Sequence, residues 1–361
     1  MAKTNGKQVN VLVVDDSAFM RRVISDILNS DPQINVMDTA KNGAEAIEKI
    51  SVLHPDVVTL DVEMPVMDGL TCLKEILKKR KMPIIMLSGL TKEGADATLQ
   101  ALENGAIDFI TKPTNIFSMS GDEKKREVIE KVKMAKNTVV REQNSNTTVI
   151  GKRQKPIERQ PNACSDIKYL VAIGTSTGGP RALQDVIPLI PADAPAAFFV
   201  VQHMPAGFTK SLAERLNNLS EVTVKEAEDM EAVQPGFVYI APGDYHMLVE
   251  RTGSDRCLRI KLNQSPSVGG HRPSVNVMMN SVADTGLNNV AGVIMTGMGG
   301  DGSEGIRNIK AKNKGYIIAQ DEKSCVVYGM PKVAVQTGVV DIVVPLKEIT
   351  REIMNFMGVQ I

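Results

Sequence analysis

Residues 11–17 read Val11-Leu12-Val13-Val14-Asp15-Asp16-Ser17, four apolar residues followed by two carboxylates and a hydroxyl. A short, uninterrupted apolar run is typical of a strand that is buried on both faces of a parallel sheet. Apolar residues then recur at helical spacing from Met20 to Leu28, and Ser17 can cap that helix. A strand followed directly by an amphipathic helix predicts a βα unit of a doubly wound sheet.

The same alternation continues along both halves of the chain. The first half contains three further predicted strands, at 57–60, 84–87 and 108–110. The second half contains six, at 169–173, 197–202, 238–241, 290–295, 316–319 and 339–344. Residues 247–249 and 258–262 flank a turn, which predicts an antiparallel hairpin laid onto that sheet. We therefore expect two α/β domains, each with a doubly wound parallel sheet.

The distribution of charge separates the two halves. The chain has 361 residues, with 42 basic and 42 acidic side chains, and a balanced charge argues against a protein that coats nucleic acid. Residues 121–160 hold 11 basic and 6 acidic residues, and the polar stretch 141–161 has no apolar periodicity. We expect domains at 8–126 and 166–358, joined by a linker at 127–165.

Cysteine usage and hydropathy predict the compartment. The four cysteines are widely spaced and form no C-x-x-C pair, so we expect reduced thiols rather than a disulfide framework or a zinc site. No apolar stretch approaches the ~18 residues of a transmembrane helix, and the N-terminal apolar run is too short for a signal peptide. Both observations predict a soluble, cytoplasmic protein without membrane insertion.

Charged and polar side chains follow the predicted strands of the first half. Asp15 and Asp16 follow the first strand, Asp61 ends the strand at 57–60, and Ser88 and Lys112 follow the next two. The carboxyl ends of parallel strands meet at one edge of the sheet. Three carboxylates there suit Mg²⁺, and with the lysine they suit a phosphoryl group that Asp61 can accept. Taken singly, each acid is more simply a helix cap or a loop residue.

Four motifs of the first half resemble the receiver domain of bacterial response regulators, which has a flavodoxin-like fold. They are VVDDS at 13–17, DVEMPVMDG at 61–69, LSG at 87–89 and TKP at 111–113. The resemblance implies that Asp61 is phosphorylated and that Asp15 and Asp16 hold Mg²⁺ together with it. It also implies that Ser88 is the switch hydroxyl and that Lys112 contacts the phosphoryl group.

The second half contains a candidate nucleophile. Residues 174–178 read GTSTG, directly after a predicted strand and before a helix. The glycines permit a sharp turn that exposes the hydroxyl of Ser176, and helix N–H groups nearby can stabilise an oxyanion. The same pattern also fits a glycine-rich phosphate loop, and the motif alone leaves both interpretations open.

A serine nucleophile needs a base and an orienting acid. His203 follows the strand at 197–202 and is the best candidate base; His271 is second, and we expect His246 to be structural. Asp301 follows the strand at 290–295 and is the candidate acid. Their chain order differs from that of known triads, but the roles depend on geometry and not on order.

A dinucleotide site is a competing interpretation. Gly297, Gly299 and Gly302 form a G-x-G-x-x-G pattern after a strand, and Asp321 follows about 20 residues later. Four predicted strands precede this motif, whereas the fingerprint normally opens its fold. A third possibility is a response regulator without catalysis that acts by binding a partner.

Four further motifs resemble the catalytic domain of the chemotaxis protein-glutamate methylesterases. They are AIGTSTGGP at 172–180, VQHMP at 201–205, RPSV at 272–275 and MTGMGGDG at 295–302. The resemblance implies a Rossmann-like catalytic domain in which Ser176, His203 and Asp301 form the triad, and in which the backbone N–H groups of Thr177 and Met298 form the oxyanion hole.

The resemblance also implies the substrate and the partners. The substrates are glutamate methyl esters, and selected glutamines, on methyl-accepting chemoreceptors, and a chemotaxis histidine kinase donates the phosphoryl group. Mg²⁺ serves the receiver, and the esterase reaction needs no cofactor. The balanced charge, in contrast, is the reason that we expect no nucleic-acid partner.

Overall fold

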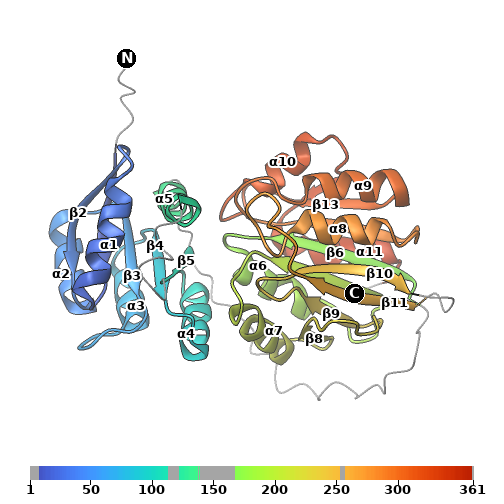
Figure 1. Ribbon diagram of the computed structural model, residues 1–361, viewed down its shortest axis with the longest axis horizontal. Coiled ribbons are helices and arrows are strands. Elements are labelled where there is room, and N and C mark those ends of the chain that lie inside the picture. The colour runs from blue at the N-terminus through green and yellow to red at the C-terminus, as the bar shows by residue number, and fades with distance from the viewer. Residues whose placement is uncertain (1–7, 113–121, 137, 139–166, 253–256, 360–361) are drawn as a thin grey trace, which may run out of the picture. The chain divides into compact units, whose positions relative to one another are not determined.

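The computed structural model describes residues 8–112, 122–136, 138, 167–252 and 257–359 (Figure 1). The chain forms two compact units, Met1–Asn146 and Thr147–Ile361, and each is described by itself. Much of the predicted linker at 127–165 lies outside the described residues.

The first unit is a five-stranded sheet in the order β2-β1-β3-β4-β5, in which every pair is parallel. The order reverses between β1 and β3, as in a doubly wound sheet. Its strands are β1 (Val9–Val14), β2 (Ile34–Ala40), β3 (Val57–Asp61), β4 (Ile84–Ser88) and β5 (Asp108–Thr111). Its helices are α1 (Ala18–Asn29), α2 (Gly43–Leu53), α3 (Gly69–Lys79), α4 (Lys92–Glu103) and α5 (Asp122–Lys136).

Local sequence explains these elements. The Ser17 hydroxyl accepts a hydrogen bond from the Met20 N–H at 3.3 Å, so the predicted cap of α1 is confirmed. The four predicted strands are present, but β2 was not predicted. It is an edge strand that buries only its terminal residues well, and its sequence INVMDTA therefore lacks a continuous apolar run.

The second unit is a seven-stranded parallel sheet in the order β14-β13-β12-β6-β7-β9-β8. Its strands are β6 (Tyr169–Thr175), β7 (Ala196–Gln202), β8 (Thr223–Glu226), β9 (Phe237–Ile240), β12 (Val290–Ile294), β13 (Tyr316–Gln320) and β14 (Ile342–Val344). The six predicted strands are present, and the short edge strand β8 was not predicted.

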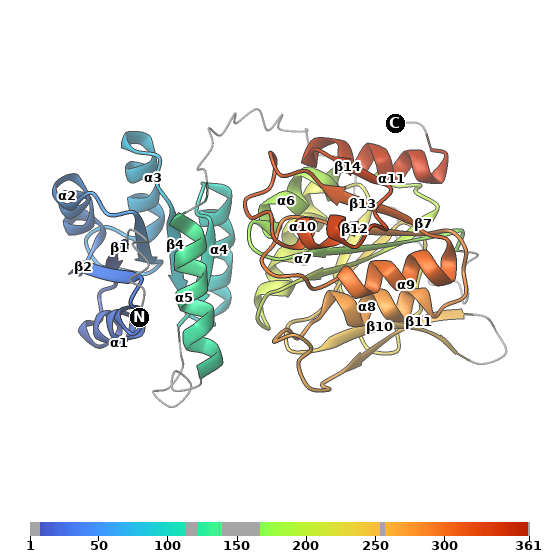
Figure 2. The ribbon, with the colours of Figure 1, turned by 90° about the horizontal axis from the view of Figure 1, so that it is seen from above.

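Helices cover both faces of this sheet (Figure 2). One face carries α8 (Val275–Ala283), α9 (Ser303–Asn313) and α10 (Met330–Gln336). The other carries α6 (Gly179–Val186), α7 (Phe208–Leu219) and α11 (Ile349–Met357), with short 3-10 turns at Ile187–Leu189 and Leu346–Glu348. The parallel strands are consequently buried on both sides, as their apolar sequences require.

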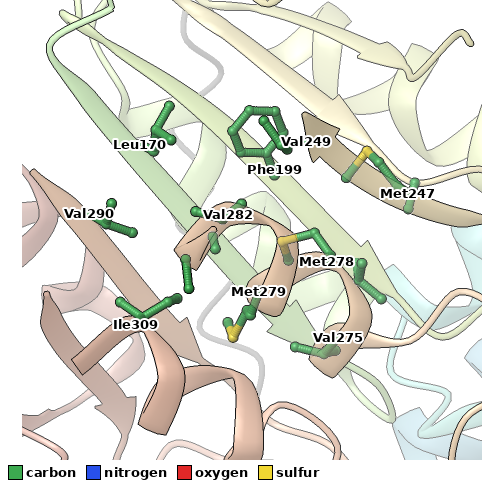
Figure 3. Packing of buried hydrophobic residues seen from close by; sticks show 14 of the residues in the cluster. Leu170, Phe199, Met247, Val249, Val275, Met278, Met279, Val282, Val290 and Ile309 are labelled. Carbon is green, nitrogen blue, oxygen red and sulfur yellow. The ribbon is translucent and has the colours of Figure 1, made fainter. Parts of the chain in front are cut away.

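The predicted hairpin is confirmed as β10 (His246–Thr252) and β11 (Cys257–Asn263), an antiparallel pair that forms a sheet of its own. Met247 and Val249 of β10 pack with Phe199 of the large sheet and with Met278 of α8 in one buried cluster (Figure 3). The hairpin is thus attached to the large sheet by side-chain packing, which the hydrophobic effect favours.

Two other sequence expectations can be compared with the structure. No helix in the described part of the chain is long and apolar enough to cross a membrane. Cys72 and Cys325 are not in a disulfide, but Cys257 is disulfide-bonded, so the prediction of four reduced thiols is wrong there. Wide spacing along the sequence does not prevent pairing, because folding decides which cysteines meet.

Candidate functional sites

The large sheet of the second unit reverses its strand order between β6 and β12. From β6 the chain continues to β7 on one side, and from β12 it continues to β13 and β14 on the other. The carboxyl ends of the strands at such a reversal open a crevice in doubly wound folds. Ser176 follows β6, His203 follows β7 and Asp301 follows β12, so all three lie at this edge.

Ser176 lies on a sharp turn between β6 and α6. Its N–H donates to the Thr296 carbonyl at 3.0 Å, and its carbonyl accepts from the Gly179 N–H at 2.8 Å. Gly178 caps α6 at a φ of 76°, a conformation that favours glycine. Ser176 is partly exposed, whereas its neighbours in the segment are buried. Its hydroxyl is therefore in a position that a substrate could reach.

His203 is bonded to Asp301. The His203 Nε2 lies 2.9 Å from Asp301 Oδ2, and the two side chains are only 8% and 5% exposed. Because a carboxylate only accepts, Nε2 carries the proton of the neutral ring and Nδ1 carries the lone pair. Nδ1 is buried and has no hydrogen-bond partner among the described residues. The basic atom of His203 is therefore Nδ1.

Asp301 also accepts hydrogen bonds from the start of α8. Its Oδ2 accepts from the Val275 N–H at 2.7 Å, and its Oδ1 accepts from the Asn276 N–H at 2.9 Å and the Ser274 hydroxyl at 3.0 Å. Burial raises the pKa of Asp301, but the bonds from His203 and the backbone N–H groups outweigh burial and lower it to about 2. Asp301 is therefore ionised throughout the neutral range.

Asn276 fixes the segment that carries Asp301. The Asn276 Oδ1 accepts from the backbone N–H groups of Gly302, Glu304 and Gly305 at 3.0, 3.1 and 2.9 Å. Asp301 thus caps α8 while Asn276 caps α9, and the two helix N-termini hold each other in place. Neither Asn276 nor the role of Ser274 is predicted from the sequence above, although a serine directly before the helical run of 275–283 is an N-cap pattern.

The backbone near Thr177 and Met298 is held by hydrogen bonds. The Thr296 hydroxyl lies 3.0 Å from the Thr177 carbonyl, and the Gly297 carbonyl accepts from the Gly329 and Met330 N–H groups at 3.1 and 2.9 Å. These bonds fix the two segments that carry the predicted oxyanion donors. The role of the two N–H groups stays a prediction.

Gly297 lies directly against the turn that carries Ser176. A Cβ added at Gly297 would lie 2.8 Å from the Ser176 Cβ, closer than real Cβ atoms approach. Glycine at 297 therefore lets the backbone after β12 approach Ser176, which gives the first glycine of the G-x-G-x-x-G pattern a packing role.

The remaining residues of the alternative interpretations have local partners. Asp321 Oδ1 accepts from the N–H and hydroxyl of Ser324 at 3.0 and 2.5 Å, which closes a turn. His246 is buried; its Nε2 contacts the Pro266 carbonyl at 3.2 Å and its Nδ1 accepts from the Ser274 N–H at 3.2 Å. His246 therefore supports the start of α8, as expected of a structural histidine.

The acidic residues of the first unit meet at the β1/β3 reversal. The Lys112 Nζ lies 2.8 Å from Asp15 Oδ2 and 2.6 Å from Asp61 Oδ2, and both carboxylates are almost fully buried. Oxygen atoms of Asp15, Asp16 and Asp61 all lie within 4.8 Å of one another. This set of hard oxygen donors fits Mg²⁺ in its chemistry. Ser88 ends β4, the strand next to β3, and so lies at the same edge of the sheet. This edge therefore carries all five side chains that the sequence predicted for it: Asp15, Asp16, Asp61, Ser88 and Lys112.

The charges of this acidic site are strongly coupled. Burial raises the pKa of Asp61 to about 6, even though Lys112 lowers it, and the charge of Asp15 adds to the rise. Burial lowers the pKa of Lys112, but the two carboxylates outweigh burial and raise it above the ordinary value. A further cation at this site would favour the ionised form of Asp61.

The Ser88 hydroxyl donates toward the Gly94 carbonyl at 3.1 Å, at the start of α4.

Comparisons with known proteins agree with the two-part architecture. The family model of the CheB methylesterase matches residues 171–353, and that of the response regulator receiver domain matches residues 11–120. A relative from Syntrophomonas wolfei subsp. wolfei is named protein-glutamate methylesterase/protein-glutamine glutaminase 1. It is 48% identical over 353 residues, which cover 96% of this chain and 99% of the relative.

Two further matches extend this result. A relative from Archaeoglobus fulgidus, named protein-glutamate methylesterase/protein-glutamine glutaminase, is 49% identical over 356 residues, which cover 98% of this chain and 99% of the relative. The crystal structure of the Thermotoga maritima CheB methylesterase catalytic domain matches at 45% identity with a TM-score of 0.50. That match covers 52% of this chain and 97% of the crystallised domain.

Proposed function

The chain belongs to the CheB methylesterase family and carries a response regulator receiver domain ahead of its catalytic part, and we propose that Ser176, His203 and Asp301 form its catalytic triad. The protein is a protein-glutamate methylesterase and protein-glutamine glutaminase of chemotaxis, regulated through its receiver domain. The bond between the buried His203 and Asp301 side chains, next to the Ser176 turn, carries the proposal of the triad.

Acylation begins when Ser176 Oγ attacks the γ-carbonyl carbon of a glutamate methyl ester. The serine proton moves to His203 Nδ1, because Nε2 is engaged by Asp301. The tetrahedral intermediate then expels methoxide, which takes the proton from Nδ1 and leaves as methanol. The product of this half-reaction is a glutamyl ester on Ser176.

Deacylation repeats the same proton movements with water. His203 Nδ1 takes a proton from water as the water oxygen attacks the acyl carbon, and the proton returns to Ser176 Oγ as the ester breaks. The released side chain is the glutamate carboxylate. A glutamine substrate follows the same route, except that its nitrogen leaves as ammonia in the first half-reaction.

Electrostatic groups around the triad lower the barriers. Asp301, ionised and fixed by two helix N-termini, stabilises the imidazolium that His203 becomes in each step. The N–H groups of Thr177 and Met298 are the proposed donors to the oxyanion, and the bonds to Thr296 and Gly297 pre-orient their segments.

Asp61 is the proposed phosphorylation site of the receiver. Mg²⁺, when bound, would neutralise charge on the incoming phosphoryl group, and Asp15, Asp16 and Asp61 would hold it. Lys112 already contacts Asp61 and can pair with the added charge, and Ser88 at the end of β4 is the proposed switch hydroxyl.

We further propose the partners and the division of the chain. The substrates are methyl-accepting chemoreceptors, whose methylated helices lie in the cytoplasm, and a chemotaxis histidine kinase is the phosphodonor. Residues 8–126 serve as the receiver and 166–358 as the esterase, with 127–165 between them. Helix α5 crosses the boundary between 8–126 and 127–165, and its Val128 and Val132 are buried.

The triad is tested by methanol release from methylated receptor membranes. We compare the wild type with Ser176→Ala, each with and without acetyl phosphate, and use Ser267→Ala, an exposed serine of the same unit, as the matched control. Release that disappears only in Ser176→Ala and rises with acetyl phosphate supports the proposal. Undiminished release from folded Ser176→Ala contradicts it.

A further inference from the structure

A second histidine covers the face of the proposed base. The rings of His203 and His271 are stacked, with centroids 3.8 Å apart and planes inclined by 8°. This spacing is close to the optimal separation of about 3.5–4.0 Å between carbon atoms. The two rings are therefore in van der Waals contact face to face, and His203 cannot tilt toward His271 without a clash.

His271 is held in place on both sides. It closes a two-residue turn with Val268, in which each N–H donates to the other residue's carbonyl at 3.0 and 3.1 Å. Gly269 and Gly270 form the turn at φ values of 60° and 83°, which glycine adopts without strain. The stacked ring thus stands on a short and well-defined segment.

The next residue anchors this turn to the rest of the domain. The Arg272 guanidinium donates to Asp244 Oδ1 at 3.1 and 2.5 Å and to the Gln264 and Ser265 carbonyls at 3.1 and 3.2 Å. Ser274, two residues further, bonds to Asp301. One segment, 271–276, therefore supports both the proposed base and its orienting acid.

The His203 ring needs such support. Among the described residues, the ring makes one hydrogen bond, from Nε2 to Asp301. The other ring nitrogen, Nδ1, is buried and has no hydrogen-bond partner there. A ring that is anchored only at Cβ and at Nε2 can still rotate about the line that joins these two atoms, and such rotation would change the direction of Nδ1. Contact with a flat, fixed neighbour removes this freedom.

We propose that His271 is a positioning residue that fixes the plane of the His203 imidazole, and hence the direction of Nδ1, during proton transfer. The inference rests on the proposed role of His203 as the base. It assigns His271 a task that needs a flat ring and not a titrating nitrogen. A ring of similar shape without nitrogen should therefore serve, and an aliphatic side chain of similar volume should not.

The test compares His271→Phe with His271→Leu in the full-length protein, using methanol release from methylated receptor membranes in the presence of acetyl phosphate. The two substitutions are matched in polarity and differ chiefly in planarity. We expect His271→Leu to lose about tenfold in kcat with KM unchanged, because the reacting atoms are misaligned while ester binding is not altered. His271→Phe should retain most of the wild-type kcat.

Three results would overturn the inference. They are wild-type kcat in His271→Leu, equal losses in the folded Leu and Phe variants, and a loss that appears in KM alone. If His271→Leu does not fold, His271→Asn provides the comparison with Phe, because it also lacks a stacking ring. His203→Gln, measured in parallel, separates the two proposals: activity in that variant overturns His203 as the base, and this inference with it.

Discussion

Asp301→Asn is the sharpest perturbation of the proposed triad, because the structure fixes what each amide orientation would meet. If the amide nitrogen replaces Oδ1, the Asn276 N–H and the Ser274 hydroxyl lose their acceptor, and the Gly302 N–H keeps only its bond to Asn276 Oδ1. If it replaces Oδ2, only the Val275 N–H loses its acceptor. The second orientation is favoured, since each unpaired buried donor costs about 1–3 kcal/mol.

The favoured orientation changes the protonation of His203, the proposed base. The amide donates to His203 Nε2, so Nε2 must carry the lone pair and Nδ1 must carry the proton. Nδ1 can then no longer accept the serine proton. In a serine triad where Asp→Asn imposes the wrong tautomer, kcat falls by about 10⁴, and we expect a loss of about 10³- to 10⁴-fold here.

Asp301→Asn should also lower the free energy of unfolding, by an amount that depends on pH. The pKa of Asp301 falls from 3.8 to about 2 in the folded protein, which corresponds to about 2 kcal/mol of stabilisation of the ionised form. A depressed pKa contributes stability that is fully present above the unfolded value of 3.8 and is lost as pH falls toward 2. The stability difference from Asp301→Asn should therefore be constant near neutrality and shrink in acid.

Three measurements test the expected effects of Asp301→Asn on kcat, stability and the His203 tautomer. Methanol release gives kcat, urea denaturation at several pH values gives the stability difference, and ¹⁵N NMR of the imidazole gives the tautomer. The reasoning is refuted if folded Asp301→Asn keeps kcat within about tenfold of the wild type, or if His203 keeps its proton on Nε2. A stability difference that grows as pH falls would contradict the assignment of the low pKa.

Three further substitutions test other parts of the site. Asp61→Asn should abolish the stimulation of methanol release by acetyl phosphate, so the ratio of rates with and without it falls to one; a persisting stimulation would place the phosphorylation elsewhere. Gly297→Ala should lower kcat by about 10²-fold, because its Cβ would lie 2.8 Å from the Ser176 Cβ; unchanged kcat would mean that the turn tolerates displacement. Ser274→Ala removes one bond to Asp301 and the cap of α8, and the free energy of unfolding should fall by about 1 kcal/mol; an unchanged free energy of unfolding would argue against the cap.

Short-range patterns were enough to predict most of the fold. Central strands such as β1 and β6 are buried on both faces, so their sequences are continuous apolar runs that stand out from the helices around them. The edge strands β2 and β8 carry polar residues because one side of each is unpaired and more exposed. They were missed because an apolar run is absent there.

The sequence by itself determined which chemical groups stand at the strand ends, since a residue that follows a buried strand must lie at the carboxyl edge of the sheet. That rule brought together Asp15, Asp61 and Lys112, and it singled out Asp301 as the candidate acid beside His203, 98 residues away. It could not specify side-chain contacts between separate loops.

Only the tertiary structure decided how these groups are held. The stacking of His271 on His203 and the capping of α9 by Asn276 join segments whose spacing along the chain carries no periodic pattern. Such contacts depend on the packing of β10, α8 and α9 over the sheet, which is set by the volumes and shapes of many buried side chains together. Local sequence places a residue at an edge, and only packing in three dimensions determines its neighbours and its orientation there.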